Sequence, residues 1–61
     1  MYEIYITTTY KPMVDNLEQA VYIANRFSKQ YSVEVEVTDT TTAEILYIAK
    51  NGVATYDVTN R

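Results

Sequence analysis

The side chains of this chain that could do chemistry are carboxylates, hydroxyls, phenols and a few basic groups, because it contains no cysteine and no histidine. That composition excludes disulfides, thiolate nucleophiles, zinc sites and imidazole acid–base catalysis within these 61 residues. Glu34 and Glu36 have strand spacing, so their carboxylates would share one face and could act as an acid–base pair. Any solvated strand shows the same spacing, and we interpret the pair as a surface feature without a catalytic role.

Three other groups of residues also lack what a metal-, phosphate- or nucleic-acid-binding site requires. Asp39 and Glu44 flank a predicted turn, which offers too few oxygen ligands to hold a hard cation. Gly52, the single glycine, belongs to a predicted hairpin turn, so no glycine-rich loop is present to hold a phosphate. Arg26 and Lys29 lack the aromatic stripe that stacks on nucleic-acid bases. We therefore predict a protein that is not an enzyme, with no catalytic or metal-binding residue, no cofactor and no small-molecule substrate.

Chain length and charge limit the kinds of ligand and partner that we expect for this chain. A chain of 61 residues makes a single domain, spanning 1–61, with little room for a ligand pocket of roughly 300 Å³ or more. The net charge of −3 argues against nucleic-acid binding, which usually needs a basic stripe. No apolar run approaches the ~18 residues of a membrane span, and the first residues show no basic or apolar signal segment. We expect a soluble protein in the cytoplasm, with no nucleic-acid and no membrane partner.

One helix is predicted, over residues 15–31, from small and apolar residues that recur at helical spacing along one stripe. The stripe consists of Leu17, Ala20, Val21, Ala24, Phe27, Ser28 and Tyr31. Asp15 is a good N-cap and Glu18 completes a capping box, although Pro12 could instead open the helix as its first residue. The opposite side of the helix is polar and includes Tyr22, which we expect to be exposed.

Four strands are predicted around this helix, from alternating polar and apolar residues bounded by turn signals. They cover residues 2–8, 32–38, 44–50 and 53–58. Residues 9–14 form the loop into the helix, with Met13 and Val14 tucked under the helix start. The predicted fold is α+β, a single helix packed on one face of a four-stranded sheet in β-α-β-β-β order. The first strand could lie beside the second in parallel, or elsewhere in the sheet.

The pair Asn51-Gly52 is the strongest hairpin signal in the chain. With a two-residue type I′ loop, the paired residues would be Lys50 with Val53, Ala49 with Ala54, Tyr47 with Tyr56, and Ile45 with Val58. The last three of these pairs make a uniformly apolar face, which we assign to the core. A three-residue loop with a glycine bulge would shift the register by one and turn Leu46 and Ile48 inward instead. Either register leaves two large residues of the third strand facing outward, Leu46 and Ile48 or Ile45 and Tyr47.

An uncovered apolar face follows from this arrangement, because one helix can cover only one face of a sheet. Two copies placed back to back or edge to edge would bury it, and a wet monomer or a different partner is the alternative. We predict a homodimer. The partner or dimer interface is predicted to include Tyr5, Tyr22, Leu46, Ile48 and Val53.

Residues 17–25, 33–39 and 45–52 resemble the short β-α-β-β-β proteins encoded by bacteriophages and other mobile elements. The middle turn of those proteins often reads D-x-x-T-G-E, and here Ala43 stands where glycine is usual, between Asp39 and Glu44. Some such proteins are anti-defence inhibitors, including anti-CRISPR proteins and the small inhibitor of the Hachiman system. The resemblance implies a phage-encoded, non-catalytic protein that inhibits a host defence protein by binding its surface in the host cytoplasm. A structural or assembly accessory protein of a phage or mobile element is the alternative, and no functional residue carries over.

Overall fold

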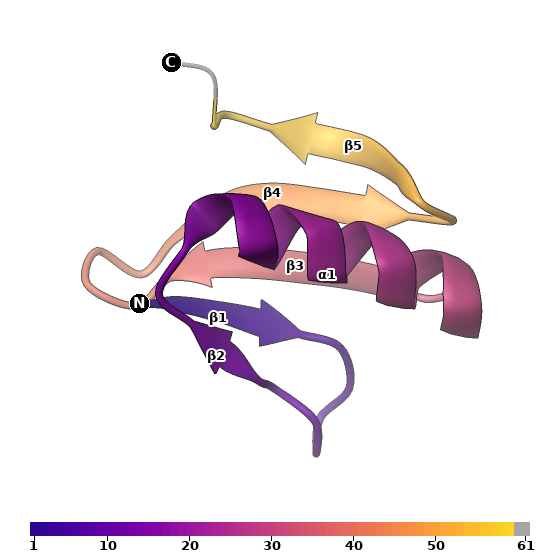
Figure 1. Cartoon of the computed structure of the whole chain (residues 1–61), viewed down its shortest axis with the longest axis horizontal. Coiled ribbons are helices and arrows are strands. Elements are labelled where there is room, and N and C mark those ends of the chain that lie inside the picture. The colour runs from indigo at the N-terminus through magenta and orange to yellow at the C-terminus, as the bar shows by residue number, and fades with distance from the viewer. Residues whose placement is uncertain (60–61) are drawn as a thin grey trace.

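The structure, a computed structural model, describes residues 1–59 and shows one helix packed on one face of a five-stranded sheet (Figure 1). The elements are β1 (Tyr2–Tyr5), β2 (Met13–Val14), α1 (Leu17–Tyr31), β3 (Glu34–Asp39), β4 (Glu44–Lys50) and β5 (Val53–Asp57). The strand order is β2-β1-β3-β4-β5, and every neighbouring pair is antiparallel. The α+β class with a single helix in the described chain is confirmed, whereas the predicted count of four strands is one too few.

The additional strand, β2, lies in the segment predicted to be a loop. Val14 pairs with Tyr2 and packs against the core as expected, but Met13 pairs with Glu3 and is 51% exposed. Successive residues of a strand point to opposite faces, so pairing with β1 turns Met13 away from the helix. The Ile4 N–H donates to the Pro12 carbonyl at 2.8 Å, which extends the contact along β1.

The first strand ends earlier than predicted because the chain folds back after Tyr5. The carbonyl of Tyr10 accepts hydrogen bonds from the N–H groups of Ile6 and Thr7, at 3.2 and 3.1 Å. The Thr7 hydroxyl in turn accepts from the Tyr10 N–H at 3.0 Å. This local bonding closes a compact loop, and Ile6 remains buried although it lies outside the strand.

The helix begins at Leu17, with Asn16 and not Asp15 as its N-cap. The side-chain oxygen of Asn16 accepts from the Gln19 N–H at 2.9 Å, so the predicted capping box and the alternative start at Pro12 are both wrong. At the other end Ser32 adopts the left-handed conformation, with φ 54°. That reversal uses Ser32 as a helix terminator, which explains why β3 starts two residues later than the predicted strand.

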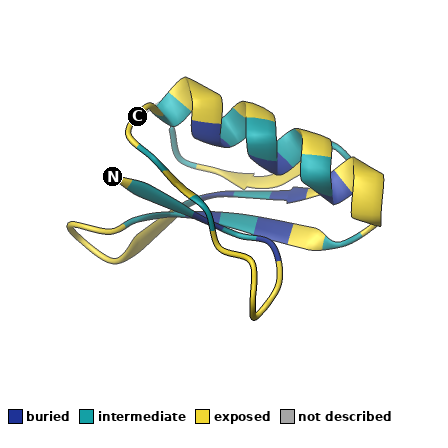
Figure 2. Ribbon diagram, turned by 60° about the horizontal axis from the view of Figure 1, so that its bottom comes forward, coloured by how far each residue is buried: buried dark blue, intermediate teal, exposed yellow. Residues whose placement is uncertain are grey.

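Three small residues hold the helix against the sheet. Ala20, Ala24 and Ser28 are fully buried, and their small side chains let α1 lie close to the strands (Figure 2). Larger residues on both sides of this line are half-buried against the core, namely Leu17, Val21, Ile23 and Phe27. Tyr31 was predicted to join the stripe but is 53% exposed, and its ring stacks on Phe27 at a centroid distance of 5.5 Å.

The helix-facing side of the sheet supplies the other half of the core. Its buried residues are Ile4, Ile6, Val35, Val37, Tyr47 and Ala49. The assignment of Tyr47 and Ala49 to the core is confirmed. All five residues of β5 are exposed, and α1 packs mainly on β1, β3 and β4 (Figure 1).

The β4–β5 hairpin follows the predicted register only next to its turn. Asn51 and Gly52 form the two-residue loop with positive φ angles of 55° and 81°, and Lys50 opposes Val53. Ala49 then opposes Ala54, as predicted, before a bulge shifts the register.

Beyond that bulge, Ile48 opposes Tyr56 and Tyr47 opposes Asp57. The expected pairing of Tyr47 with Tyr56 is therefore wrong. Thr55 is the extra residue, and it places Tyr56 on the face away from the helix, where it is 44% exposed. Ala54 is also exposed, so the predicted core contribution of β5 is wrong at both positions.

A second bulge lies between β3 and β4. Val37 opposes Tyr47 but Thr38 opposes Ile45, which makes Leu46 the extra residue. Ile45 consequently shares the face of Thr38 and is 38% exposed, so its assignment to the core is also wrong. Val58, predicted as its partner, lies past the end of β5 and donates its N–H to the Leu46 carbonyl at 3.0 Å.

Polar contacts tie the helix to the β4–β5 turn. The Tyr47 hydroxyl donates to the Asn25 side-chain oxygen at 2.7 Å, and the Gly52 N–H donates to the Ser28 hydroxyl at 2.9 Å. Ser28 itself donates to the Asn25 carbonyl at 3.0 Å. These bonds satisfy the buried Ser28 hydroxyl and fix how α1 lies across the sheet. No helix or strand of the described chain covers the opposite face of the sheet.

Candidate protein-binding surface

The sheet face opposite α1 is the strongest candidate for a functional surface, and we call it the uncovered face. Directly opposed residues of antiparallel strands point to the same side, so the strand registers define its rows. The middle row runs across four strands and consists of Tyr5, Glu36, Ile48 and Tyr56. The row on one side consists of Met13, Glu3, Thr38 and Ile45, and the row on the other side of Glu34, Lys50 and Val53.

Apolar side chains occupy much of this surface. Val53 is 65% exposed, Met13 51%, Tyr56 44% and Ile45 38%. Tyr5, Leu46 and Ile48 are half-buried, yet none of them is among the side chains packed against the core under the helix. Covering a face of this composition with another surface removes apolar side chains from water, which is favourable.

The structure brings together four of the five predicted interface residues. Tyr5, Leu46, Ile48 and Val53 belong to the uncovered face, by register or by their separation from the core. Tyr22 lies on the solvent side of α1, in the other layer of the molecule, and is 63% exposed. A partner seated on the uncovered face would not touch it.

Three apolar members of the face were predicted to lie elsewhere, Met13 under the helix start and Tyr56 and Ile45 in the core. Met13 reaches the face only through β2, a strand too short to show an alternating pattern. Tyr56 and Ile45 reach it through the two bulges, each of which depends on a single extra residue. The outward direction of Ile45 was foreseen only in the alternative register.

Charges on the uncovered face are mainly acidic. Glu36 stands in the middle row between Tyr5 and Ile48, and Glu3 and Glu34 flank it on neighbouring rows. Lys50 opposes Glu34 and provides one positive charge within the rows. A second lies at the edge, where the Lys11 ammonium is 5.3 Å from the centre of the Tyr5 ring. The surface therefore suits a partner that brings basic side chains.

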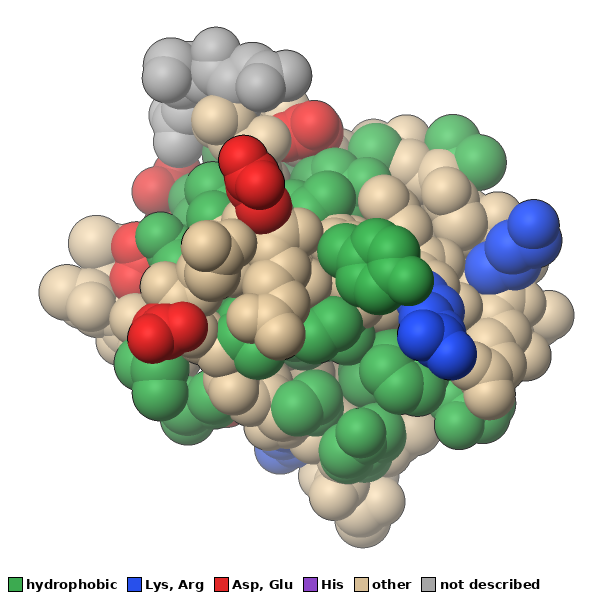
Figure 3. Space-filling model, viewed as in Figure 1, with side chains coloured by type: hydrophobic (Ala, Val, Ile, Leu, Met, Phe, Trp, Pro, Cys, Tyr) green, Lys and Arg blue, Asp and Glu red, His purple; other side chains and the backbone are tan. Residues whose placement is uncertain are grey.

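The helix side of the molecule is different in character. Figure 3 shows this side, on which acidic side chains gather around the start of α1, basic side chains lie mainly toward its end, and apolar side chains lie between them. Glu18 lies in the first turn of the helix and Lys29 in the last, an order that complements the helix dipole. These charges have a structural explanation and need no ligand.

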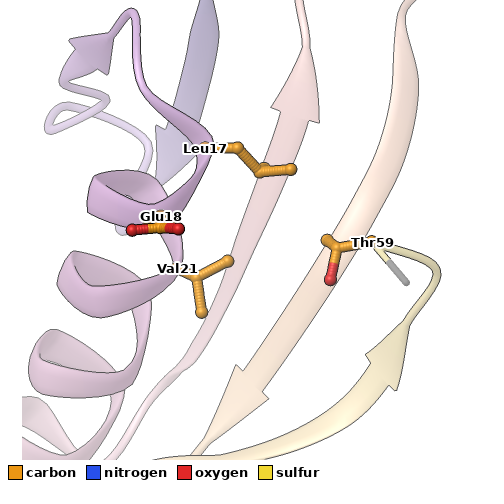
Figure 4. Close-up of a pocket in the computed structure, with 4 residues that line it drawn as sticks. All are labelled: Leu17, Glu18, Val21 and Thr59. Carbon is orange, nitrogen blue, oxygen red and sulfur yellow. The ribbon is translucent and has the colours of Figure 1, made fainter.

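A hollow of about 400 Å³ lies between the start of α1 and the segment after β5 (Figure 4). Leu17, Glu18, Val21 and Thr59 line it, and the side chains of Leu17 and Val21 extend from the helix toward the strands. Its volume exceeds what the chain length led us to expect. The lining offers one carboxylate and one hydroxyl, which do not form an acid–base pair or a nucleophile with its base.

One carboxylate of the described chain has a shifted pKa with a clear local cause. The Thr59 hydroxyl and the Thr59 N–H both donate to Asp57, and these bonds hold the pKa of that carboxyl below its ordinary value. Asp57 is exposed and its partner follows it in the chain, so the bonds form a turn at the end of β5. The shift has a structural origin.

Residues 1–59 contain no cluster of three or more His, Cys, Asp or Glu side chains that could hold a metal ion. In the same range, no helix has both the length and the apolar composition required to cross a membrane.

Comparison with known proteins adds no family to these observations: no protein-family model, no curated protein and no solved structure matches the chain.

Proposed function

We propose that this protein is a small non-catalytic binding protein that attaches to another protein through its uncovered face. The observation that carries the proposal is the middle row, where Tyr5, Ile48 and Tyr56 stand in line across the sheet with no element of residues 1–59 above them. Burying a large apolar side chain contributes roughly 1.5–3 kcal/mol, and aromatic residues are enriched at the centres of interfaces.

The acidic groups of the face favour a partner with a basic surface. Glu36 lies between apolar neighbours in the row and is half-buried, so an arginine or lysine of the partner could pair with it as water is excluded. Two uncovered faces placed against each other would instead bring like charges together. This argues for a different protein as the occupant of the face.

The resemblance to small phage-encoded proteins extends the proposal to a biological role. We propose that the protein is phage-encoded and inhibits a host antiviral defence protein by covering part of its surface, as a homodimer in the host cytoplasm. An inhibitor that works by covering a surface needs affinity and shape, which a small rigid sheet provides, and it needs no catalytic group.

The experiment uses bacterial strains that each carry one antiviral defence system. The wild-type protein and the Ile48→Asp and Tyr22→Ala variants are produced in each strain, which is then challenged with a phage that its system blocks. Ile48→Asp places a charge in the middle of the uncovered face, whereas Tyr22→Ala changes the other layer. We expect the wild type and Tyr22→Ala to restore plaques in one strain, and Ile48→Asp to fail while circular dichroism shows it folded.

Two results would contradict the proposal. If a folded Ile48→Asp variant restored plaques as well as the wild type, the uncovered face would not be the inhibitory surface. If no strain responded and affinity capture with the wild type retained a phage structural protein, the accessory role in assembly would replace inhibition.

A further inference from the structure

The outer edge of β5 is open. β5 pairs with β4 on one side, all five of its residues are exposed, and within residues 1–59 no strand lies on its other side. The opposite edge of the sheet is protected, because β2 has only two residues and follows Lys11 and Pro12. β5 itself contains no lysine, arginine or proline. A strand edge of this kind is a template for a further strand.

The bulge in β5 determines which backbone groups point outward. Lys50 and Val53 close the two-residue turn and face each other, so the peptide groups of Ala54 point to the open edge. The Val58 N–H donates to the Leu46 carbonyl and so points toward β4. The N–H and C=O groups of the preceding residue, Asp57, therefore also point to the open edge. Regular strands repeat this direction at every second residue. Here the extra residue Thr55 sets the two outward positions three residues apart.

A second copy of β5 matches this irregular spacing, whereas a regular strand does not. In an antiparallel pair related by a two-fold axis, Ala54 faces Asp57 of the second copy and Asp57 faces its Ala54. Each of these positions offers one N–H and one C=O to the other. The side chains agree as well, because Ala54 opposes Ala49 and Asp57 opposes Tyr47, which places both on the helix side of the sheet.

We propose that two copies of this chain associate through the outer edges of their β5 strands and form one continuous sheet. The helix does not obstruct this contact, since α1 packs mainly on β1, β3 and β4 (Figure 1). Each Asp57 faces an alanine of the other copy, which keeps the two carboxylates apart. The two-fold axis lies perpendicular to the sheet, so both helices cover the same side and the two uncovered faces join into one surface with Tyr56 on each side of the axis.

This inference deepens the homodimer of the proposed function by assigning its interface, and the edges can pair whatever the uncovered face binds. Its consequence for binding is bivalency. Two joined faces would present two equivalent sites to a partner, and such an arrangement raises the overall affinity for a dimeric or repetitive target.

The test is sedimentation velocity over a range of concentrations, with the variants Ala54→Pro and Ile48→Asp. Proline at position 54 removes the outward N–H without removing a bond to β4. We expect the wild type and Ile48→Asp to form dimers, and Ala54→Pro to raise the dimer dissociation constant by roughly ten- to a hundredfold. Failure of the proposed function would appear separately, as an Ile48→Asp variant that still inhibits.

A measurement on the unaltered protein covers the case in which Ala54→Pro does not fold. Amide hydrogen exchange should slow at Ala54 and Asp57 as the protein concentration rises, with no comparable change in Gly52. A wild type that stays monomeric at all concentrations would overturn the inference. So would a dimer that Ile48→Asp dissociates, or exchange at Ala54 and Asp57 that does not depend on concentration.

Discussion

Three residues other than glycine adopt a left-handed backbone conformation in the described chain. They are Ser32, Ala43 and Asn51, with φ angles of 54°, 60° and 55°. Asparagine tolerates this conformation, but alanine pays a steric cost because its Cβ approaches the following carbonyl. Ala43 closes the β3–β4 turn, where its N–H donates to the Asp39 carbonyl at 2.7 Å.

Replacing Ala43 with glycine should therefore stabilise the protein. The side chain is exposed, so little contact is lost, and we expect the free energy of unfolding to rise by about 0.5–1 kcal/mol in urea denaturation. Ala54→Gly is the matched control, because Ala54 lies in β5 without a positive φ and the same change should lower stability by about 0.5–1 kcal/mol. A destabilised Ala43→Gly variant would show that the turn does not strain this residue.

The hydrogen bonds in the turn after β5 predict how stability changes at low pH. Since folding lowers the pKa of Asp57, the contribution of this carboxyl to stability is complete above its ordinary value of 3.8 and is lost as the pH falls through the lower folded value. Thr59→Val removes the hydroxyl bond, which is the larger cause of the shift, and should move the pKa of Asp57 up toward 3.8. NMR titration of the Asp57 carboxyl measures this directly. An unchanged pKa in Thr59→Val would mean that the hydroxyl does not hold the carboxylate.

At the scale of elements, residue patterns predicted what depends on many residues and missed what depends on one or two. The helical stripe, apart from Tyr31 at its end, and the bounds of β4 were correct because each rests on several positions of regular spacing. The two bulges could not be foreseen, since an extra residue in one strand leaves the alternation on each side intact. β2 was missed because two residues show no period, and only their pairing with β1 makes them a strand.

The first residue of the helix also depends on a single interaction, and the identity of the N-cap can be tested. Asp15 and Asn16 are both good N-caps, and only the bond from the Gln19 N–H identifies Asn16. Asn16→Ala should lower the free energy of unfolding by about 0.5–2 kcal/mol, with a smaller effect for the matched change Asp15→Ala. Thermal or urea unfolding measures both. A larger loss for Asp15→Ala would place the cap one residue earlier.

For the molecule as a whole, the existence of an uncovered apolar face followed from the sequence, but its composition did not. A single helix in the described chain must leave one side of the sheet free, and Tyr5, Leu46, Ile48 and Val53 were placed on that side correctly. Tyr22 was grouped with them only because it is exposed, and exposure alone does not tell the two layers apart. The identity of the proposed partner depends on that partner's own shape and charge, which the sequence of this chain does not encode.

The most direct test of the binding surface is photo-crosslinking from one tyrosine position in each layer. A photoreactive phenylalanine analogue replaces Tyr5 in the middle row of the uncovered face or, as the control, Tyr22 on the solvent side of α1. Both proteins are irradiated in bacterial cells that produce them. The account predicts a covalent adduct to a different protein from position 5 and none from position 22. An adduct from position 22 alone, or one from position 5 to a second copy of this chain, would contradict it.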